Sequence, residues 1–287
     1  MKFDIHILGA GVAGFNLAKK LKENGFSGEV YLIDKRRYYF ERKSTFSLLV
    51  KDKIEVVDLK KISSKLGINF ISKKVERINF SKRRLFFKDG GFSDFKNLVI
   101  ATGIISKDLS FLKGKNYEGV FFLSEIDPFF VRDYLRISKE ITIFSFTFLG
   151  MKLAFFLSSL GKEIRLFLSP SFTVKKKVLK SLNSQGVNIH FEKIEEIIGE
   201  KEVKAIKTEK GKFYSSQCVF IDSGFKPNTK LFSCSLNFSY IYLLGDVKNK
   251  EIENRYFFFK NNYFCQKEAD NLALSFVEKQ RIKETIC

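Results

Sequence analysis

Residues 9–14 read Gly-Ala-Gly-Val-Ala-Gly, and this stretch decides the fold. It follows a short apolar run at residues 3–8 and precedes a segment, from about Phe15 to Asn24, in which apolar residues recur at helical spacing. A second apolar run, Glu29–Ile33, comes next. This order predicts a buried strand, a glycine-rich turn, a helix and a second strand.

Each glycine of this G-x-G-x-x-G pattern has its own physical role. Gly9 permits a tight turn, Gly11 lets the backbone approach a pyrophosphate, and Gly14 allows the helix to pack closely on the sheet. The start of the helix offers free N–H groups and the positive end of a dipole to an anion. Asp34 ends the second strand 20 residues after Gly14, where its carboxylate would accept hydrogen bonds from a ribose. The constellation predicts a dinucleotide site, and a glycine-rich turn without a ligand is the alternative.

Composition excludes several other classes of protein. The chain has 287 residues, 45% of them hydrophobic, with 3 prolines and 4 cysteines, which excludes collagen-like and disulfide-scaffold proteins. The longest nearly uncharged central stretch, Ile141–Met151, is far shorter than the roughly 20 residues that a transmembrane helix needs. No signal-peptide pattern opens the chain, and we expect a reducing, cytoplasmic setting.

Metal sites and cysteine relays are not expected. The only two histidines are His6 and His190. The four cysteines lie too far apart for a CxxC pair or a zinc site, at Cys218, Cys234, Cys265 and Cys287. The sequence therefore predicts no metal ligand.

The chain is strongly basic. Lys and Arg number 51 against 32 Asp and Glu, which gives a formal net charge of +19. A basic face would attract anionic lipid or nucleic acid, but basic residues are spread along the chain and cluster only briefly at Lys35–Arg37 and Lys175–Lys177. Phe is also inflated, at 34 residues, as base bias in a genome produces. We expect no nucleic-acid partner, and peripheral contact with a membrane surface stays open.

Three further motifs follow along the chain. Residues 69–88 alternate in polarity and end at a turn, Asp89–Gly91, which predicts a small antiparallel meander. The run Asn97–Gly103 reads as a buried strand that ends in Ala-Thr-Gly. Much later, Tyr240–Leu244 forms another apolar strand, closed by Gly245-Asp246.

Taken in order, these motifs resemble those of the FAD/NAD(P)-binding pyridine nucleotide–disulfide oxidoreductase superfamily, which includes type II NADH dehydrogenases, NADH oxidases and ferredoxin reductases. The resemblance implies an α/β fold of two Rossmann-like, three-layer domains, with the NAD(P)-type domain inserted in the FAD domain. We expect the FAD domain at residues 1–110 and 233–287 and the NAD(P)-binding-like domain at 111–232. After Gly245-Asp246 we expect one helix, about Asn262–Lys279, and not the interface domain of the family.

The inserted segment supports this layout. Glu140–Phe144, Phe148–Leu160 and Lys162–Leu168 read as a second strand, helix and strand, and Val187–Thr208 reads as a hairpin. Val219–Gly224 then resembles the strand and turn that lead the chain back to the FAD domain.

The resemblance also implies where FAD binds. The pyrophosphate would lie on Gly9–Gly14, the adenosine ribose on Asp34, and Asp246 would bond the ribityl or pyrophosphate region. Arg42 stands where relatives often have an arginine that contacts FAD, and an ordinary solvated arginine is the alternative. The residues expected at FAD are Gly9, Gly11, Val12, Ala13, Gly14, Asp34, Lys35, Arg42, Ala101, Thr102, Gly103, Gly245 and Asp246.

The second fingerprint departs from the family pattern. Ser145–Gly150 (SFTFLG) keeps only the third glycine, and a side chain on Thr147 would stand where the backbone should approach a pyrophosphate. Leu168 replaces the acid that would bond a ribose, although Ser169 and Ser171 could help to hold a 2′-phosphate. The residues that would form an NAD(P) region are Thr147, Gly150, Lys152 and Gly224. The use of NAD(P)H is therefore left open.

Other departures concern the flavin. Lys152 stands where many relatives carry a glutamate that faces the isoalloxazine, and it either places a cation near the flavin or is surface variation. The disulfide-relay branch of the family is excluded, because no close cysteine pair exists. Cys265 is either a redox group or, as is typical of a lone cysteine, a small buried apolar residue. The aromatic run Tyr256–Phe259 either packs as core or shapes an acceptor pocket.

The predicted function is that of an FAD-dependent oxidoreductase, which passes electrons from NAD(P)H through flavin to a small-molecule or protein acceptor. No separate catalytic acid, base or nucleophile is expected, because the cofactor carries the reaction. The alternatives are an FAD-binding pseudoenzyme or redox sensor, and an electron-transfer subunit whose basic surface meets an acidic ferredoxin-like protein. The acceptor, the choice between NADH and NADPH, and the oligomeric state are not predicted.

Overall fold

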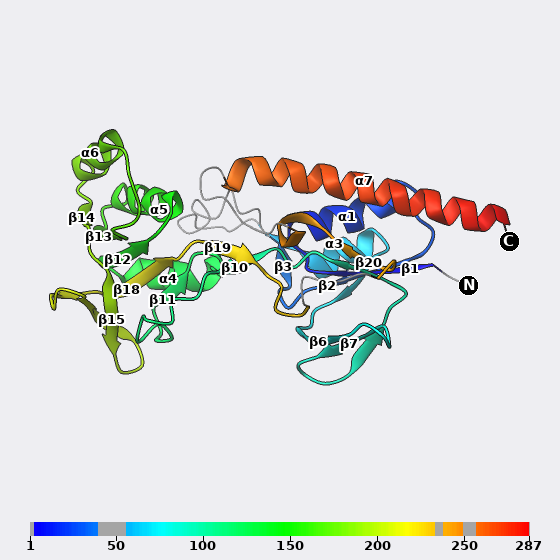
Figure 1. Ribbon diagram of the computed structural model, residues 1–287, viewed down its shortest axis with the longest axis horizontal. Coiled ribbons are helices and arrows are strands. Elements are labelled where there is room, and N and C mark those ends of the chain that lie inside the picture. The colour runs from blue at the N-terminus through cyan, green and yellow to red at the C-terminus, as the bar shows by residue number, and fades with distance from the viewer. Residues whose placement is uncertain (1–2, 40–55, 233–237, 249–256, 287) are drawn as a thin grey trace.

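Two α/β units, each built around a five-stranded parallel sheet, make up the fold (Figure 1). The computed structural model describes residues 3–39, 56–232, 238–248 and 257–286. The two units lie at opposite ends of an elongated molecule, and a pair of short strands, β10 (Ile104–Ser106) and β19 (Phe225–Pro227), lies between them.

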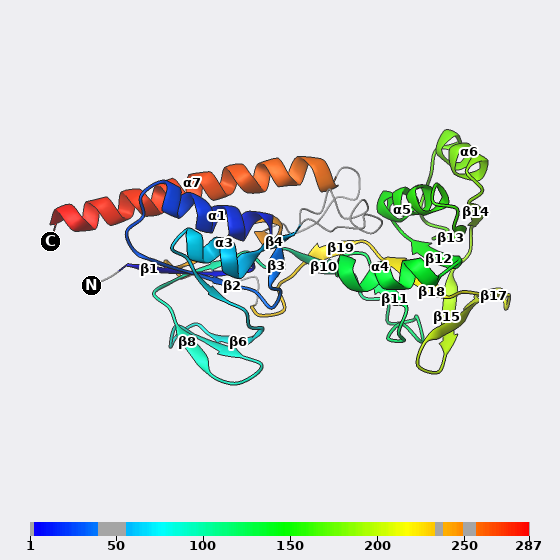
Figure 2. The same ribbon diagram turned by 180° about the vertical axis from the view of Figure 1, so that it is seen from behind.

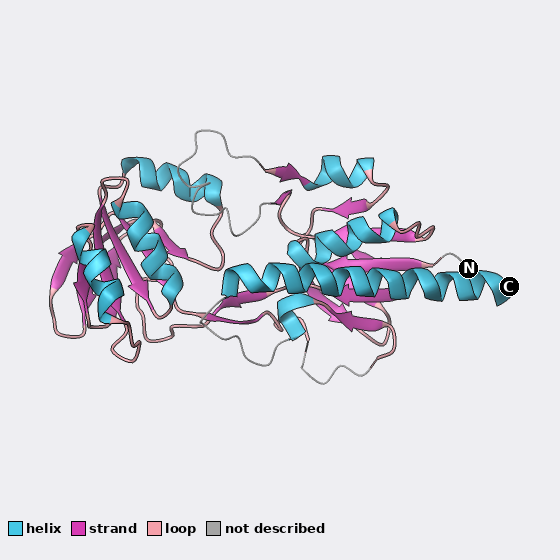
Figure 3. Cartoon of the chain, turned by 90° about the horizontal axis from the view of Figure 1, so that it is seen from above, coloured by secondary structure: helices cyan, strands magenta, loops and turns pink. Residues whose placement is uncertain are grey.

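The first unit takes strands from both ends of the chain. Its sheet has the order β20-β9-β1-β2-β5, and every neighbouring pair is parallel. Helices α1 and α7 cover one face and run side by side (Figure 3). An antiparallel sheet, β6-β7-β8, packs on the other face. The bounds are β1 Asp4–Leu8, α1 Val12–Glu23, β2 Glu29–Ile33, β3 Tyr38–Tyr39, β4 Val57–Asp58, α3 Leu59–Lys65, β5 Asn69–Ile71, β6 Val75–Asn79, β7 Arg84–Phe87, β8 Phe92–Asp94, β9 Asn97–Ile100, β20 Ile241–Leu243, η2 Gly245–Lys248 and α7 Phe257–Ile286.

The second unit repeats the same three layers. Its sheet has the order β11-β18-β12-β13-β14, again parallel throughout. Helices α4, α5 and α6 cover one face, and an antiparallel sheet, β15-β16-β17, covers the other. In the view from behind, the small antiparallel sheets of both units lie on the lower side (Figure 2). The bounds are β11 Val120–Phe122, α4 Pro128–Ile137, β12 Glu140–Ser145, α5 Phe148–Ser158, β13 Glu163–Leu168, α6 Lys176–Ser184, β14 Asn188–His190, β15 Ile194–Gly199, β16 Val203–Thr208, β17 Phe213–Ser215 and β18 Cys218–Asp222.

The second unit interrupts the first. All of its strands, β11 to β18, lie between β9 and β20 in the chain. The chain leaves the first unit through β10 and returns through β19, and these two strands pair antiparallel. The predicted α/β fold, with one Rossmann-like domain inserted in another, is therefore confirmed. The boundaries near residues 110 and 232 stay predictions.

Two short strands differ from the sequence prediction. Asn69–Ile71, expected in the antiparallel meander, is the edge strand β5, which runs parallel to β2. Asn188–His190, expected in a hairpin, is the edge strand β14 beside β13. Each has only three residues, and the alternation of polarity is the same for an edge strand of either direction. The pattern alone therefore does not select the partner.

The last helix, α7, is longer than predicted. It spans 30 residues, Phe257–Ile286, and not only Asn262–Lys279. Buried Ala269, Ala273 and Phe276 join the core that α1 and the first sheet share. Near its end, Gln280 Oε1 accepts a hydrogen bond from Ser27 N at 3.2 Å. None of the described helices, α7 included, is long and apolar enough to cross a membrane.

Candidate dinucleotide sites

The first glycine loop joins β1 to α1 at the carboxyl end of the sheet. Gly9 has a φ of +108°, and a Cβ built on it would lie 2.4 Å from the carbonyl oxygen of Ala101. A Cβ on Gly14 would lie 1.9 Å from the carbonyl oxygen of Gly9. A Cβ on Gly11 would meet nothing within 4 Å. Two glycines are therefore required by packing, whereas Gly11 leaves open space where a ligand can approach the backbone.

Asp34 closes this loop from the end of β2. Its Oδ2 accepts a hydrogen bond from Ala10 N at 2.8 Å, and its Oδ1 accepts one from Arg36 N at 2.9 Å. The side chain is 10% exposed, and the neighbouring Lys35 is exposed. A carboxylate offers about four lone-pair sites, so Asp34 retains acceptor capacity for a ribose hydroxyl.

The start of α1 carries backbone donors that no described side chain caps. Its N-cap is Gly11, and the structure gives it no side-chain cap. Val12 and Ala13 occupy the first two helical positions. Because the first N–H groups of a helix have no partner within the helix, they are available to an anion.

Other predicted FAD residues gather around this loop. Ala101 follows β9 beside Gly9, and its N–H donates to Leu8 O at 2.8 Å. A Cβ on Gly245 would lie 2.9 Å from Ala13 Cβ, so the Gly245-Asp246 turn packs against α1. Asp246 is half-buried in η2. Predicted Arg42 lies outside the described residues.

Thr102 and Gly103 connect the loop region to the returning chain. Thr102 Oγ1 donates to Asn228 O at 2.9 Å, and Asn228 N donates to Gly103 O at 2.9 Å. These hydrogen bonds join Thr102 and Gly103 to Asn228, and they therefore connect the two chain segments that run between the units.

Sequence reasoning missed Glu268, which supports the Gly245 turn from α7. Its Oε2 accepts from Gly245 N at 3.0 Å, and its Oε1 accepts from Lys248 Nζ at 3.0 Å. The only signal in the sequence is an acidic residue on the helix that follows Gly245-Asp246. Its position alone does not show whether its side chain faces the Gly245 turn or solvent.

The second loop, between β12 and α5, is filled by the chain itself. The Asp222 carboxylate oxygen Oδ2 accepts hydrogen bonds from Thr147 Oγ1 at 2.6 Å, Gly150 N at 2.9 Å and Ser145 Oγ at 3.0 Å. Thr147 caps α5, because its Oγ1 accepts from Leu149 N at 3.1 Å. All four groups of this cluster, Ser145, Thr147, Gly150 and Asp222, are buried.

Asp222 was not predicted as a site residue. It ends β18, and the parallel register places it directly beside Ser145 of β12. Burial raises the pKa of its carboxyl, and the hydrogen bonds from Thr147, Gly150 and Ser145 act in the opposite direction. The sequence does contain a signal, namely an acidic residue after the apolar run Cys218–Ile221. Its position near α5, however, depends on the pairing of β18 with β12, which the sequence pattern does not show.

Other predicted residues of the second loop are dispersed. Lys152 is exposed on α5, and Gly224, with a φ of +74°, lies in the turn after β18. Leu168 is fully buried in the core. Buried Ser169 shares a hydrogen bond with Ser171 at 2.9 Å.

Cys265 lies in the first unit and is only 7% exposed in the core that it shares with Ala13 and Leu17. This environment is that of a small apolar residue. In the described ranges, no three His, Cys, Asp or Glu side chains gather as a metal ion would require. Tyr256 and the side chains of Phe257–Phe259 lie outside the described part of the chain.

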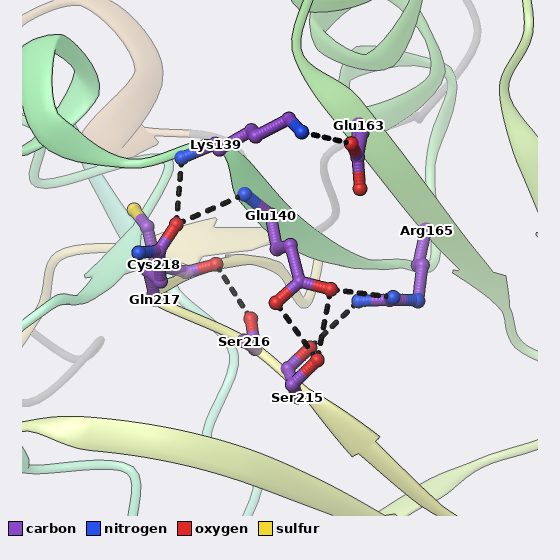
Figure 4. Close-up of polar contacts among 8 residues, drawn as sticks. All are labelled: Lys139, Glu140, Glu163, Arg165, Ser215, Ser216, Gln217 and Cys218. Carbon is purple, nitrogen blue, oxygen red and sulfur yellow. Dashed lines mark hydrogen bonds and ion pairs between the residues drawn. The ribbon is translucent and has the colours of Figure 1, made fainter.

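A separate polar network lies at the amino-terminal ends of the strands of the second sheet, opposite to the Ser145–Gly150 loop (Figure 4). Glu140 Oε1 accepts from Arg165 Nη2 and from Ser215 Oγ, each at 2.8 Å. Gln217 Oε1 accepts from the backbone N–H groups of Lys139, at 2.6 Å, and Glu140, at 3.1 Å. The Arg165 and Ser215 hydrogen bonds lower the pKa of Glu140. This network ties the starts of β12, β13 and β18 together, at the other end of β12 from Ser145.

The sequence pattern of one family, described as Pyridine nucleotide-disulphide oxidoreductase, matches residues 3–254. The chain belongs to this family. Members of the pyridine nucleotide-disulphide oxidoreductase family typically bind FAD and NAD(P)H. The loop Gly9–Gly14 and the corresponding loop Ser145–Gly150, each at the carboxyl end of a parallel sheet, are consistent with that membership.

Two curated relatives are similar over part of their length. Human (Homo sapiens) apoptosis-inducing factor 3 is 27% identical over 164 residues, which cover 56% of this chain and 27% of that protein. The NADH oxidase of Methanocaldococcus jannaschii is 23% identical over 251 residues, which cover 78% of this chain and 55% of that protein. The chain thus spans about a quarter to a half of these relatives.

A solved structure shares the fold of nearly the whole chain. The ferredoxin reductase for the CYP199A2 system from Rhodopseudomonas palustris superposes with a TM-score of 0.77 at 19% identity. The match covers 94% of this chain and 76% of that chain. This similarity extends over both units, and it concerns the fold.

Proposed function

We propose that this chain is an FAD-dependent oxidoreductase whose first unit holds the cofactor. The observation that carries the proposal is the loop Gly9–Gly14, in which packing requires Gly9 and Gly14 while the space at Gly11 stays open. The pyrophosphate of FAD would lie against Gly11 and the first N–H groups of α1, and Asp34 would accept from the adenosine ribose. Gly245-Asp246 would border the ribityl chain, because this turn packs on α1.

FAD, when bound, supplies the electron-accepting and electron-donating chemistry. The chain's own residues have the tasks of binding and orientation. Asp34 holds the loop through Ala10 N and keeps the ribose in place. Glu268 fixes the Gly245 turn through the backbone N–H of that glycine.

The test is a titration of the purified full chain with FAD, followed by absorbance and calorimetry. We expect one FAD per chain. Gly11→Val adds a side chain in open space at a φ of −74°, which any residue adopts, so this variant should fold while its FAD affinity falls about 100-fold or more.

Gly90→Ala is the matched control for that titration. Gly90 has a φ of +88° in the turn between β7 and β8, away from the loop, so the substitution strains the fold without touching the site. FAD binding that is equal in wild type, Gly11→Val and Gly90→Ala would refute the proposed site.

For the donor, the contacts at α5 favour a partner other than NAD(P)H. Thr147 and Asp222 already take the N–H groups of Leu149 and Gly150. We propose an acidic electron-carrier protein, because the chain has a net charge of +19 and complementary charge speeds association.

This donor class is tested with the FAD-loaded chain and a reduced, acidic plant-type ferredoxin under anaerobic conditions. We expect the flavin absorbance to bleach, at a rate that falls steeply as ionic strength rises, since screening weakens the attraction between the proteins. Bleaching by dithionite is the control that the flavin can be reduced. A rate that does not respond to salt would contradict the acidic-partner proposal.

A second candidate is a redox sensor that binds FAD without turning over. The same occupied N–H groups at α5 favour it, because they remove the usual entry of electrons. This candidate predicts reduction by dithionite, no reduction by any carrier protein, and a change of stability between the oxidised and reduced states. Steady turnover with a carrier and an acceptor would exclude it.

A further inference from the structure

Two N–H groups at the start of α5 donate hydrogen bonds to side chains of the same unit. The start of α1 differs, because no described side chain caps it. At a working dinucleotide loop, the first N–H groups of the helix remain available for a pyrophosphate. Here Leu149 N donates to Thr147 Oγ1 at 3.1 Å, and Gly150 N donates to Asp222 Oδ2 at 2.9 Å. Two of the first N–H groups of α5 are therefore already used.

The same side chains also explain why Gly150 is the one glycine that remains. A Cβ on Gly150 would lie 2.3 Å from Ser145 Oγ and 3.2 Å from Asp222 Oδ2. The space beneath the helix is thus filled by the hydroxyl and the carboxyl group. Gly150 is required by this packing, and its presence does not depend on a ligand.

The three polar side chains bond to one another through Asp222 Oδ2, while Asp222 Oδ1 is buried without a hydrogen-bond partner among the described residues. The single hydroxyl hydrogen of Ser145 is shared between Thr147 O, at 2.8 Å, and Asp222 Oδ2, at 3.0 Å, and Thr147 Oγ1 donates to Asp222 Oδ2 at 2.6 Å. Asp222 is 1% exposed and Ser145 is fully buried. An incoming phosphate would have to displace hydrogen bonds between buried groups, which lose stability when they are left unpaired.

We infer that Asp222, with Ser145 and Thr147, excludes NAD(P)H from the second unit. The cluster takes the N–H groups of Leu149 and Gly150, places a carboxyl group beside the start of α5, where the dinucleotide would bring its own negative charge, and adds side-chain bulk at Thr147, the position of the second glycine. Buried Leu168 completes the exclusion, since it provides no acceptor for the ribose. The second unit is then a scaffold or docking module, and electrons reach the flavin from another donor.

This inference deepens the proposed function by restricting its donor. The exclusion of NAD(P)H depends on residues of the second unit, and it can be measured as a binding affinity without any turnover of the enzyme. The test is isothermal calorimetry of the full chain, after incubation with FAD, with NADH and then NADPH. For the wild type we expect no binding tighter than about 1 mM.

The variant that should restore binding is Ser145→Gly/Thr147→Gly/Asp222→Ala. It removes the three side chains together, so none of them is left without its partner, and it frees the N–H groups of Leu149 and Gly150 for a phosphate. Glycine is tolerated at the N-cap position that Thr147 occupies. We expect a dissociation constant at least about 10-fold lower than that of the wild type. Thr147→Gly alone keeps the Asp222–Gly150 bond and should not bind.

Glu140→Gln is the matched control. It disturbs a hydrogen-bonded carboxylate of the same sheet at the opposite edge (Figure 4), and it should leave NADH binding as weak as in the wild type. If the triple variant does not fold, Thr147→Gly/Asp222→Ala serves in its place, because Ser145 Oγ can still donate to the carbonyl of residue 147.

Two results would overturn the inference: micromolar binding of NADH or NADPH by the wild type, or a folded triple variant that binds no better than wild type. Failure of the FAD proposal has a separate signature. The chain would then show no flavin absorbance after dialysis, before any NADH is added, while the calorimetric comparison between wild type and variants would still be valid.

Discussion

The two glycine loops of this chain stand at equivalent places of two similar units, and they solve the same packing problem in opposite ways. At α1, glycines bring the helix onto the sheet and no described side chain takes its first N–H groups. At α5, a serine, a threonine and a buried aspartate fill the equivalent space with their own hydrogen bonds. The comparison teaches that a Rossmann-like unit keeps its architecture when side chains of the unit itself take N–H groups at the start of its helix.

The largest effect should come from adding a methyl group to the packed glycine of each loop. In Gly14→Ala the new Cβ would meet a backbone oxygen at 1.9 Å, whereas in Gly150→Ala it would meet the Ser145 side chain, Oγ at 2.3 Å and Cβ at 2.6 Å. We expect a loss of about 3 kcal/mol or more in the free energy of unfolding for Gly14→Ala and about 1–2 kcal/mol for Gly150→Ala. Urea unfolding measures both.

A double-mutant cycle sharpens this comparison. Removing the side chain in Ser145→Gly should rescue most of the loss in Gly150→Ala, because the remaining contact is with Asp222 at 3.2 Å. In Gly14→Ala the closest contact, at 1.9 Å, is with the backbone oxygen of Gly9, which no side-chain substitution removes, so this loss cannot be rescued in the same way. Equal losses without any rescue would show that the two loops are not packed differently.

The next largest effect is a loss of stability at low pH that arises from His6 in the first sheet. Burial lowers the pKa of His6 in β1 from its ordinary 6.5 to about 4, so the neutral ring stabilises the fold fully above pH 6.5 and this stability is lost as the pH falls through about 4. At 1.36 kcal/mol per pH unit, the difference between 6.5 and about 4 corresponds to a loss of about 3 kcal/mol. His6→Phe can still stack on Tyr31 but does not titrate, and it should lose less stability between pH 7 and 4 in urea unfolding. An acid response identical to that of the wild type would contradict this assignment.

A smaller effect is expected when Asp34 is replaced. Asp34→Ala leaves Ala10 N without the acceptor that it has at 2.8 Å, which should cost about 1 kcal/mol of stability and weaken FAD binding about 10-fold. Asp34→Asn keeps an acceptor oxygen and should retain most of the stability. FAD titration and thermal melting measure the two effects, and unchanged affinity in Asp34→Ala would remove the ribose role from this residue.

The subtlest test uses the opposite response to pH in the second unit. Burial raises the pKa of Asp222 above its ordinary 3.8. The stability that its proton contributes is therefore complete below pH 3.8 and is lost as the pH rises through the raised value. The Asp222→Asn side chain does not titrate. The melting temperature of this variant should therefore rise relative to that of the wild type as the pH increases from 4 to 8. A constant difference across that range would place the carboxyl in an ordinary, solvated environment.

The sequence predicted the fold well wherever a strand is long and buried. Glu29–Ile33 has the expected bounds because five consecutive strand residues carry a clear signal. The edge strands β5 and β14 were assigned to the wrong sheets because three residues of mixed polarity fit either a parallel or an antiparallel neighbour. The local pattern does not contain the information that chooses between these partners.

The candidate sites were predicted unevenly for a related reason. The first loop is local in sequence, so Gly9–Gly14 could be found directly, and Asp34 follows within the same strand–helix–strand unit. The group that fills the second loop, Asp222, is 75 residues from Thr147 along the chain. Only the adjacency of β12 and β18 brings the two together, and the strand order had to be known before this contact could be inferred.

The two units also differ in when they can be completed during synthesis. All strands of the second unit, from β11 to β18, are contiguous, so this unit can fold while the ribosome is still adding residues. The first unit must wait for β20, η2 and α7, because Phe276 and Gln280 of the last helix contact Phe3 and Ser27 at the start of the chain. A stalled nascent chain that ends after β19 would therefore present a folded inserted unit beside an unfinished first unit, and the proposed cofactor would be captured only after α7 has been synthesised.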